Sequence, residues 1–358
     1  MNLQMSNPLT RRFVKNTVFI LLGIFAVAGC RRETESDIVP GTGIRNVVLI
    51  GWDGCQRSHM EDLLRAGSLP NLKKLIDEGG YVHTRVTTGA TVTKPGWAEI
   101  LTGYSAERLK ITSNRNFAPI PRGYTVFERF KDISYGKMAV IFIGGKINNI
   151  GHRGPHKICK NCITRDPITH LKTFHWDENA PQVRSVPTAG GGPQRWVPRE
   201  GEPYFNVHPV LDCHKTALGS AEHVGPEALS ALESFKGRPF FAFFHFEEPD
   251  EQGHVYGENS REYSEAIRTA DVWLGRIVAK LRRSGIYETT AVFVVSDHGM
   301  DEDGNEHFNA PETFLVTNLK KKLRSGDRKD VTPTLLQSLG INADKFRPRL
   351  EGRSLIDD

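Results

Sequence analysis

The stretch PFFAFFHFEEPDEQGHVYG, residues 239–257, starts as an apolar strand and ends in acidic and histidine residues. Its run from Phe240 to Phe246 is typical of a strand that is buried on both faces of a mostly parallel sheet. A central strand cannot continue through Pro249, so the strand is expected to end just before it. In open α/β sheets, ligands bind just past the carboxyl ends of the strands. The stretch therefore predicts an α/β fold with a site at this edge of the sheet.

Asp250 and His254 lie four positions apart in the same stretch. If a helical turn follows the strand, this spacing puts both side chains on one face of the helix. A carboxylate and an imidazole that converge there form a suitable pair of zinc ligands. The alternative is a solvated acidic loop that carries a surface histidine, and the rest of the chain has to decide between the two.

The composition is that of a folded globular protein. Of the 358 residues, 38% are hydrophobic and 25% are charged, which argues against disorder and allows one large α/β domain or two smaller ones. The net charge is +5, but several basic residues lie in the first 15 positions and at Arg31 and Arg32. The remainder is close to balanced, so the charge indicates no surface for a nucleic-acid polymer.

Residues 1–30 predict an export signal, in which a basic region precedes an apolar run from Val18 to Val27 that is short for a membrane span. The run ends in Val-Ala-Gly-Cys30, which resembles a bacterial lipobox. Lipidation of Cys30 would anchor the chain to a membrane, on the periplasmic or extracellular face of the cell envelope. Residues 31–43 then predict a polar tether. The alternatives are an uncleaved anchor and a plain secretory signal.

The remaining cysteines leave two interpretations open. Cys159 and Cys162 form a CxxC pair in a histidine-rich segment. An oxidised loop suits an exported protein, and a second, structural zinc site is the other interpretation. The sequence does not say how these cysteines pair with Cys55 or Cys213.

Two further predicted strands end in carboxylates. The strand from Asn46 to Ile50 leads into Gly-Trp-Asp53-Gly. The strand 291–295 leads into Ser-Asp297-His298-Gly. An aspartate flanked by glycines at the end of a buried strand suits a metal or phosphate site, although Asp53 alone could equally cap a helix.

Thr93 precedes Pro95 by two residues, and a helix is expected to start near that proline. The threonine hydroxyl would then lie at a helix N-terminus, where partial positive charge stabilises an anion. The hydroxyl pKa is too high for an alkoxide to form unaided, and a bound metal is the usual remedy. Without other ligands nearby, Thr93 would be a simple cap residue.

Between these motifs, strands alternate with amphipathic helices, which predicts one α/β domain at 44–358 with a largely parallel sheet. Residues 259–285 are expected to form a long helix that begins with a capping box of Asn259 and Glu262. The composition changes at about 148–215, where glycine and proline are frequent and periodicity is lost. We interpret this irregular segment as a cap inserted over the site.

The candidate site residues share one feature, which is that they follow strands or start helices at the expected edge of the sheet. Three carboxylates, three imidazoles and one threonine are enough ligands for two zinc ions with positions left open. Two metals about 3.5–4 Å apart form a clamp for in-line phosphoryl transfer. The set is Asp53, Asp250, Asp297, His254, His298, His307 and Thr93.

Three motifs make the sequence resemble the alkaline phosphatase superfamily, and within it the nucleotide pyrophosphatase/phosphodiesterase branch. They are Glu-Glu-Pro-Asp250 with Gly-His254, Ser-Asp-His298-Gly-Met, and Thr93-x-Pro followed by Leu-Thr-Gly103. The resemblance covers most of residues 44–342 apart from the inserted segment. It implies a three-layer sandwich, with helices on both faces of the central sheet, and hydrolysis of a phosphate ester.

The resemblance also implies roles for individual residues. Asp250, His254 and His307 would hold one zinc ion, and Asp53, Asp297 and His298 the other. Thr93 would contact the metals and attack phosphorus to form a covalent phospho-enzyme. Asn114 lies where the family has an asparagine that donates a hydrogen bond to a phosphoryl oxygen.

Three alternatives remain beside a phosphodiesterase. The sulfatase branch shares Leu-Thr-Gly103 and Gly-Lys146, but it needs a cysteine or serine where this chain has Thr93, and it uses an oxygen-rich calcium site. A phosphomonoesterase or phosphotransferase of the same superfamily is the second alternative. The third is a zinc-binding lipoprotein without catalytic activity.

Lys146 bears on the choice between monoesters and diesters. Similar monoesterases carry a Lys-x-Arg pair at the end of the strand that here ends in Gly144-Gly-Lys146. Of the two cations, only one remains here, at Lys146. A monoester carries one more negative charge than a diester, so it benefits more from a second cation. We therefore expect Lys146 to bind substrate and diesters to be preferred. The alternative is that Lys146 pairs with a local carboxylate.

We predict that Cys30→Ala blocks lipidation, because the thiol is the acceptor of the lipid. Fractionation of cells should find the variant outside the membrane fraction or with its signal uncleaved. Unchanged processing and unchanged membrane association would contradict the lipobox.

Overall fold

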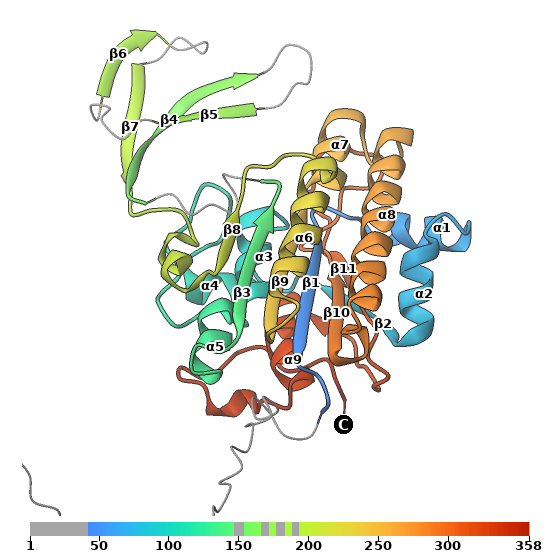
Figure 1. Ribbon diagram of the computed structural model, residues 1–358. Helices are drawn as coiled ribbons and strands as arrows, with labels where there is room; N and C mark the ends of the chain where they lie inside the picture. The colour runs from blue at the N-terminus through green and yellow to red at the C-terminus, as the bar shows by residue number, and fades with distance from the viewer. Residues whose placement is uncertain (1–41, 147–153, 166–171, 177–182, 188–192, 358) are drawn as a thin grey trace, which may run out of the picture. The chain divides into compact units, whose positions relative to one another are not determined.

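The computed structural model describes residues 42–146, 154–165, 172–176, 183–187 and 193–357. The main sheet has eight strands in the order β12-β2-β11-β10-β1-β9-β3-β8 (Figure 1). Neighbouring strands run parallel except that β11 is antiparallel to both of its neighbours. The α/β class with a mostly parallel sheet is therefore confirmed. The strands are β1 (Asn46–Trp52), β2 (Gly80–Arg85), β3 (Ala139–Gly144), β8 (Cys213–Lys215), β9 (Phe240–Phe246), β10 (Thr290–Val295), β11 (Glu312–Thr317) and β12 (Gly326–Asp327).

The strands β10, β1 and β9 lie side by side, and every one of their residues is buried. Their aliphatic and aromatic side chains suit a strand covered on both faces. The register places Gly51 of β1 opposite both His245 of β9 and Val295 of β10. The three strands therefore end at the same edge of the sheet, and the residues that follow them come together there.

Side chains of β1 alternate between two hydrophobic cores, one on each face of the sheet. Val48 and Ile50 pack in the core that α1, α2, α6 and α8 cover, and Val47 and Leu49 pack in the core that α3, α5 and α9 cover. This arrangement confirms the three-layer sandwich, and Figure 1 shows α6 and α8 in front of the sheet. The α-helices are α1 (Arg57–Arg65), α2 (Pro70–Glu78), α3 (Thr93–Thr102), α4 (Ala106–Leu109), α5 (Val126–Ile133), α6 (Ala221–Phe235), α7 (Glu248–Tyr256), α8 (Arg261–Arg283) and α9 (Val331–Ser338). Short 3-10 helices lie at η1 (Phe205–Val210), η2 (Tyr287–Thr289), η3 (Arg328–Asp330) and η4 (Ala343–Lys345).

Helix α8 begins with a different cap from the one that the sequence predicts. Ser260, not Asn259, is the N-cap residue, and its hydroxyl accepts a hydrogen bond from the Tyr263 N–H at 3.0 Å. The Asn259 amide instead donates to Asp303. A tertiary contact thus removes Asn259 from the cap, and serine, an equally good cap residue, takes its place.

The segment 148–215 differs from the irregular structure that its composition predicts. Its described residues include a second sheet of four antiparallel strands in the order β5-β4-β7-β6. The pairing register shifts between β4 and β5 and between β6 and β7, and such irregularities break the alternation on which a strand prediction depends. The strands are β4 (His156–Arg165), β5 (Lys172–Trp176), β6 (Val183–Pro187) and β7 (Pro193–Arg199).

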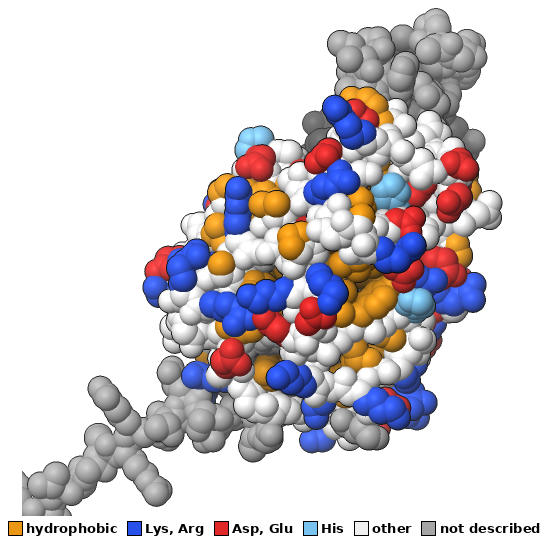
Figure 2. Space-filling model, turned by 90° about the vertical axis from the view of Figure 1, so that its right-hand side faces the viewer, with side chains coloured by type: hydrophobic (Ala, Val, Ile, Leu, Met, Phe, Trp, Pro, Cys, Tyr) orange, Lys and Arg blue, Asp and Glu red, His pale blue; other side chains and the backbone are white. Residues whose placement is uncertain are grey.

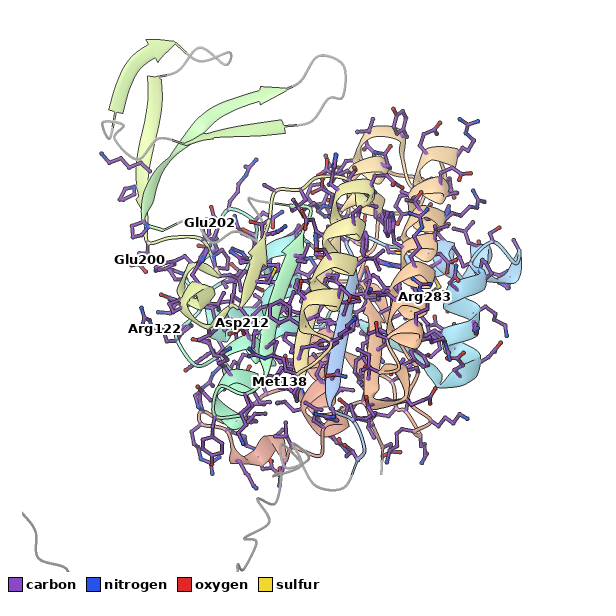
Figure 3. The ribbon with its side chains drawn as sticks, viewed as in Figure 1. Arg122, Met138, Glu200, Glu202, Asp212 and Arg283 are labelled. Carbon is purple, nitrogen blue, oxygen red and sulfur yellow. The ribbon has the colours of Figure 1, made fainter. Side chains whose placement is uncertain are left out.

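The end of this segment belongs to the main core. Tyr204 and Val207 are buried among the side chains of the α3 and α5 layer. Residues 213–215 form β8 and pair with β3 at the edge of the main sheet. Asp212, next to β8, accepts a hydrogen bond from the Val140 N–H of β3 at 2.8 Å (Figure 3). The role of the inserted strands as a cap stays a prediction.

The predictions for the N-terminus and for the CxxC pair fall on parts that the structure does not describe. The signal, Cys30 and the tether up to residue 41 lie outside the described residues, and so do the side chains of Cys159 and Cys162. Within the described part of the chain, no helix combines the length and the apolar character that a bilayer span requires.

On the face that Figure 2 shows, acidic and basic side chains are intermingled. Ion pairs between acidic and basic side chains lie along α2 and α8. Lys73 pairs with Asp77 one turn later on α2, and Arg282 of α8 pairs with Glu78 at 2.7 Å. Exposed pairs of this kind each contribute up to about 1 kcal/mol and keep the charge of the face balanced.

Candidate active site

The three carboxylates predicted from the sequence lie at one edge of the main sheet. Asp53 follows β1, Asp250 follows β9 at the start of α7, and Asp297 follows β10. All three are almost completely buried. Because the parent strands are neighbours in register, residues almost 250 positions apart in sequence meet in a small volume.

Asp250, His254 and His307 form the first group of potential metal ligands. The two residues of α7 are one helical turn apart, as their spacing predicts, and His254 Nε2 lies 3.5 Å from Asp250 Oδ1. His307 comes from the loop after β10, and its Nε2 lies 3.7 Å from the same oxygen. His254 Nδ1 donates to the Asn305 carbonyl at 2.8 Å, so its Nε2 carries the lone pair that faces the group.

Asp53, Asp297 and His298 form the second group. His298 Nε2 lies 3.4 Å from Asp297 Oδ2 and 3.9 Å from Asp53 Oδ1. His298 Nδ1 donates to the Gly299 carbonyl at 2.9 Å, which again leaves Nε2 as the lone-pair atom. The Gly54 N–H donates to Asp297 Oδ1 at 3.2 Å and orients that carboxylate.

These two groups fit divalent metal ions. Within each, the potential ligand atoms all lie within 4.8 Å of one another. Asp250 Oδ1 and Asp297 Oδ2 are buried and have no hydrogen-bond partner in the structure. Burying a charged oxygen without a partner is costly, and a cation between the ligands would remove that cost. Carboxylate oxygens mixed with imidazole nitrogens are the ligand set typical of zinc.

The carboxylates titrate differently. Burial is the largest influence on Asp53 and disfavours its charged form, but the Lys146 ammonium and the hydrogen bond from His245 together outweigh it, so the pKa of Asp53 is lowered. Burial also opposes the charged form of Asp250, but Lys146 and the imidazoles of His254, His307 and His298 together hold its pKa well below its usual range. For Asp297, burial and the nearby Asp53 charge prevail and raise the pKa well above its ordinary value. An added cation would favour the ionised form of Asp297 and so couple metal binding to proton release.

Burial favours the neutral form of two of the imidazoles, those of His298 and His307. Burial, followed by the neighbouring His307, lowers the pKa of His298 to about 3. Burial also lowers the pKa of His307. The neutral imidazole is the form that binds a metal, so both rings are ready to act as ligands over the physiological range.

Thr93 lies at the first position of α3, close to where the sequence predicts a helix start. Its side chain is buried, and Thr93 Oγ1 lies 3.5 Å from both Asp53 Oδ1 and His298 Nε2. Asn114 lies beside the same helix start, where its Oδ1 accepts a hydrogen bond from the Lys94 N–H at 2.9 Å. The structure thus brings the hydroxyl, the helix N-terminus and the amide of Asn114 together.

Lys146 lies between the two groups of ligands. Its Nζ is 2.8 Å from Asp53 Oδ1, and it also forms an ion pair with Asp250. The Lys146 side chain is 7% exposed. These contacts match the alternative in which Lys146 pairs with a carboxylate, and they place the ammonium at the site, as a substrate contact would also require.

Arg328 is a contact of the site that the sequence analysis missed. It is fully buried at the start of η3, and its guanidinium binds Glu99 of α3 at 2.5 Å and the Asp297 carbonyl at 3.0 Å. It also donates to the carbonyls of Thr88 and Ala90, in the loop that leads to Thr93. One side chain therefore ties a ligand segment to the helix of Thr93. An isolated arginine in a polar loop carries no sequence signal for this role.

A second contact missed at the sequence level lies next to Thr93. Lys94 and Glu202 form a buried ion pair at 3.1 Å, and the Lys94 ammonium lies 3.9 Å from the centre of the Phe117 ring. Glu202 follows the inserted strands in the chain (Figure 3). The segment that returns from the insert is thus attached to the start of α3.

Two glycines allow the close packing of the site. Gly54 has φ +63°, and a Cβ there would lie 2.7 Å from Asp250 Cβ. At Gly96 of α3, a Cβ would lie 2.7 Å from Asp297 Cβ. Any larger residue at either position would push a ligand away.

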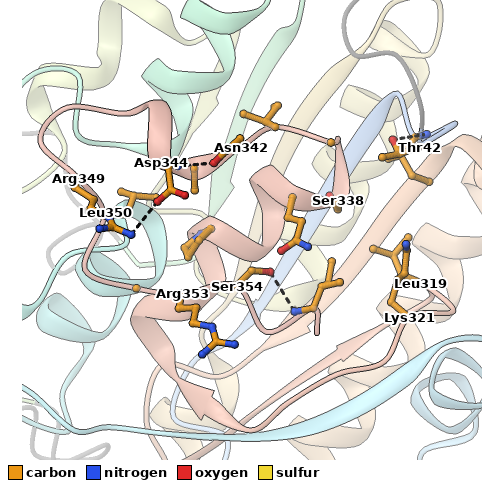
Figure 4. Close-up of a pocket in the computed structure, with 18 of the residues that line it drawn as sticks. Thr42, Leu319, Lys321, Ser338, Asn342, Asp344, Arg349, Leu350, Arg353 and Ser354 are labelled. Atoms are coloured by element: carbon orange, nitrogen blue, oxygen red, sulfur yellow. Dashed lines mark hydrogen bonds and ion pairs between the residues drawn. The ribbon is translucent and has the colours of Figure 1, made fainter. Parts of the chain in front are cut away.

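The groove drawn in Figure 4 lies elsewhere in the fold. Thr42 and Ile44, just before the start of β1, line it together with Arg349 and Arg353. It therefore lies at the amino-terminal end of β1, whereas the candidate site lies past its carboxyl end. None of the site residues predicted from the sequence lines this groove.

Comparison with known proteins agrees with this geometry. The family "Type I phosphodiesterase / nucleotide pyrophosphatase" matches residues 47–345. Bis(5'-adenosyl)-triphosphatase ENPP4 of Homo sapiens is 24% identical over 288 residues, which are 79% of this chain and 52% of that protein. Venom phosphodiesterase 2 of Crotalus adamanteus is 30% identical over 95 residues, 25% of this chain and 12% of that protein. The chain spans about half the length of the ENPP4 relatives it matches.

Solved structures show the same fold. The lipoteichoic acid synthase LtaP of Listeria monocytogenes has a TM-score of 0.51 at 14% identity, over 90% of this chain and 78% of that one. A putative sulfatase of Bacteroides fragilis has a TM-score of 0.50 at 15% identity, over 88% of this chain and 80% of that one. At such low identity, these similarities establish the architecture alone.

We predict that Gly96→Ala disturbs the second group of ligands, because the new methyl group would collide with Asp297. Overpacking of this kind costs about 1–3 kcal/mol. The melting temperature should fall, and a metal bound by this group should be released at a lower chelator concentration. Gly237→Ala is the matched control, because a Cβ there meets nothing within 4 Å. Equal behaviour of the two variants would contradict the prediction.

Proposed function

The chain belongs to the type I phosphodiesterase/nucleotide pyrophosphatase family, a family of phosphoric ester hydrolases, and on that premise we propose that it is a di-zinc phosphodiesterase with Thr93 as nucleophile. One observation carries the proposal. Thr93 Oγ1 is equidistant, at 3.5 Å, from a carboxylate and an imidazole of the second ligand group. A hydroxyl in that position would lie next to a cation held by this group, and such a cation would supply the activation that the hydroxyl needs.

In the proposed reaction, Thr93 Oγ1 attacks phosphorus as the bond to the leaving alcohol or phosphate breaks, and the proton of the hydroxyl passes to the leaving oxygen. Water then attacks phosphorus as the bond to Thr93 breaks, and one proton of this water restores the Thr93 hydroxyl. Two zinc ions, one in each group, would favour the alkoxide form of Thr93 and stabilise negative charge on the phosphoryl oxygens. The N-terminus of α3 and the amide of Asn114 add positive potential and a hydrogen bond at the same place.

We propose that the substrate is a small molecule with a phosphodiester or pyrophosphate linkage. The support is the family and the names of the relatives, which are bis(5'-adenosyl)-triphosphatases and venom phosphodiesterases. A sulfatase is the weaker candidate, because Thr93 stands where a sulfatase needs a cysteine or serine.

We also propose that the enzyme is lipid-anchored through Cys30 in the cell envelope. The chain enters the domain at the amino-terminal end of β1, and the candidate site lies past the carboxyl end of the same strand. A tether attached at Thr42 would therefore leave the site at the opposite edge of the sheet, accessible to small solutes.

Thr93→Ala should abolish turnover of p-nitrophenyl phosphodiesters while the bound metal and the melting temperature stay unchanged. The substitution removes the nucleophile but no carboxylate or imidazole. Thr93→Ser should retain part of the activity, because it keeps the hydroxyl. Elemental analysis should find two zinc ions in the wild type and in both variants. Near-full activity of Thr93→Ala would assign the nucleophile to another residue.

Diesters should have a higher kcat/KM than matched monoesters, because Lys146 is already paired with two carboxylates and adds little attraction for a second negative charge. Lys146→Ala should lower the rates for both ester classes, since Asp53 and Asp250 lose a counterion. Lys137→Ala, which changes an exposed lysine, is the control. A large monoester preference that Lys146→Ala abolishes would make the protein a phosphomonoesterase.

A further inference from the structure

We propose that Trp97 and His245 are positioning residues that together hold one oxygen of Asp53, so that only the other oxygen faces Thr93 and the second ligand group. The inference rests on the proposed metal site. Neither residue belongs to the set of ligands, and neither was singled out by the sequence analysis.

Both side chains bind the same carboxylate oxygen. Trp97 Nε1 donates to Asp53 Oδ2 at 2.9 Å, and His245 Nε2 lies 2.7 Å from it. A carboxylate without its proton only accepts hydrogen bonds, so the His245 Nε2–H is the donor in the second contact. All three side chains are fully buried, which keeps water from competing for this oxygen.

The other oxygen of Asp53 faces the site. Oδ1 lies 2.8 Å from Lys146 Nζ and 3.5 Å from Thr93 Oγ1. With Oδ2 occupied by two donors, the carboxylate can offer a metal only Oδ1, in one orientation. Hydrogen bonds from outside a metal site that orient a ligand in this way are a general feature of metal centres.

Trp97 also connects the ligand to the nucleophile. Thr93 and Trp97 are four residues apart on α3, so they lie on one face of the helix, and each contacts a different oxygen of Asp53. The hydrogen bond from Trp97 therefore sets how far α3 lies along β1, and with it the distance from Thr93 to the second group. Gly51 permits this approach, because a Cβ there would lie 2.3 Å from the indole ring.

His245 reaches Asp53 from the neighbouring strand, β9. It lies on β9, directly opposite Gly51 of β1, and its ring packs edge-on against the Trp97 indole with centroids 5.2 Å apart. Each ring therefore restricts the other, and both point a donor at one oxygen. His245 Nδ1 has no hydrogen-bond partner in the structure, so the contact with Asp53 is the single polar bond that orients this ring.

Substitutions that keep bulk but remove the donor test the proposal. Trp97→Phe and His245→Met do this, and His245→Gln places an amide N–H near the position of Nε2. Trp52→Phe is the matched control, because Trp52 is equally buried on β1 and its indole N–H has no partner. Metal affinity is measured by chelator competition on the full-length protein, together with kcat, KM and the melting temperature.

We expect Trp97→Phe and His245→Met each to weaken one of the two bound zinc ions about 10–100-fold, the usual effect of losing such a contact, and to leave the other zinc ion unchanged. The value of kcat should fall more than KM rises, because Thr93 is displaced. Trp52→Phe and His245→Gln should resemble the wild type. A structural role alone would lower the melting temperature without this selective loss of one metal.

Two results would overturn the inference, namely equal weakening of both zinc ions and unchanged affinity for both. If Trp97→Phe and His245→Met do not fold, His245→Gln and His245→Asn provide the same contrast, because the shorter asparagine amide cannot reach Asp53. Equal zinc affinity in these two variants would then overturn it. A wild-type protein without bound metal would instead show that the proposed function itself is wrong.

Discussion

The burial of three carboxylates at the ends of three adjacent strands is the constraint on which the rest of the site depends. Asp53, Asp250 and Asp297 cannot all be ionised in a dry environment unless positive charge lies among them. Lys146 offsets part of that charge, and burial, this ammonium, the nearby imidazoles and the neighbouring carboxylates together separate the pKa values of the three acids. The imidazoles of His298 and His307, whose neutral form is favoured, and the unpartnered carboxylate oxygens would let bound cations balance the remaining charge, as the proposed two-metal site requires.

The precision of this arrangement comes from residues behind the ligands. Helix α3 carries Thr93 at its first turn, and several of the contacts that fix its position lead back to the ligand segments. Trp97 binds Asp53, Gly96 packs on Asp297, and Glu99 shares Arg328 with the Asp297 carbonyl. These contacts connect Thr93, the proposed nucleophile, to the second ligand group, so a change behind the site would alter the distance between the hydroxyl and its neighbours.

Much of the fold could be predicted, and so could the six residues that the structure groups as potential metal ligands, because both depend on local patterns. Buried strands followed by carboxylates, and the four-residue spacing of Asp250 and His254, are visible along the chain. The inserted segment was predicted wrongly as irregular, since strands with shifted registers lack the alternation that marks a regular strand. The cap of α8 was also wrong, because the amide of Asn259 binds Asp303 across the fold. Contacts between distant segments, such as those of Trp97, His245 and Arg328, leave no periodic signal.

The sequence alone determined the types of the candidate ligands and the place of a threonine hydroxyl at a helix start, because these features depend on residues that are close together along the chain. It also determined the α/β class, because strands that are buried on both faces require apolar runs such as Phe240 to Phe246. Only the tertiary structure decided which oxygen of Asp53 faces the site, where Lys146 points and how α3 is fixed. Those features depend on strand register and on packing across the sheet. Both bring together residues that are far apart in the sequence, and this happens only when the chain folds.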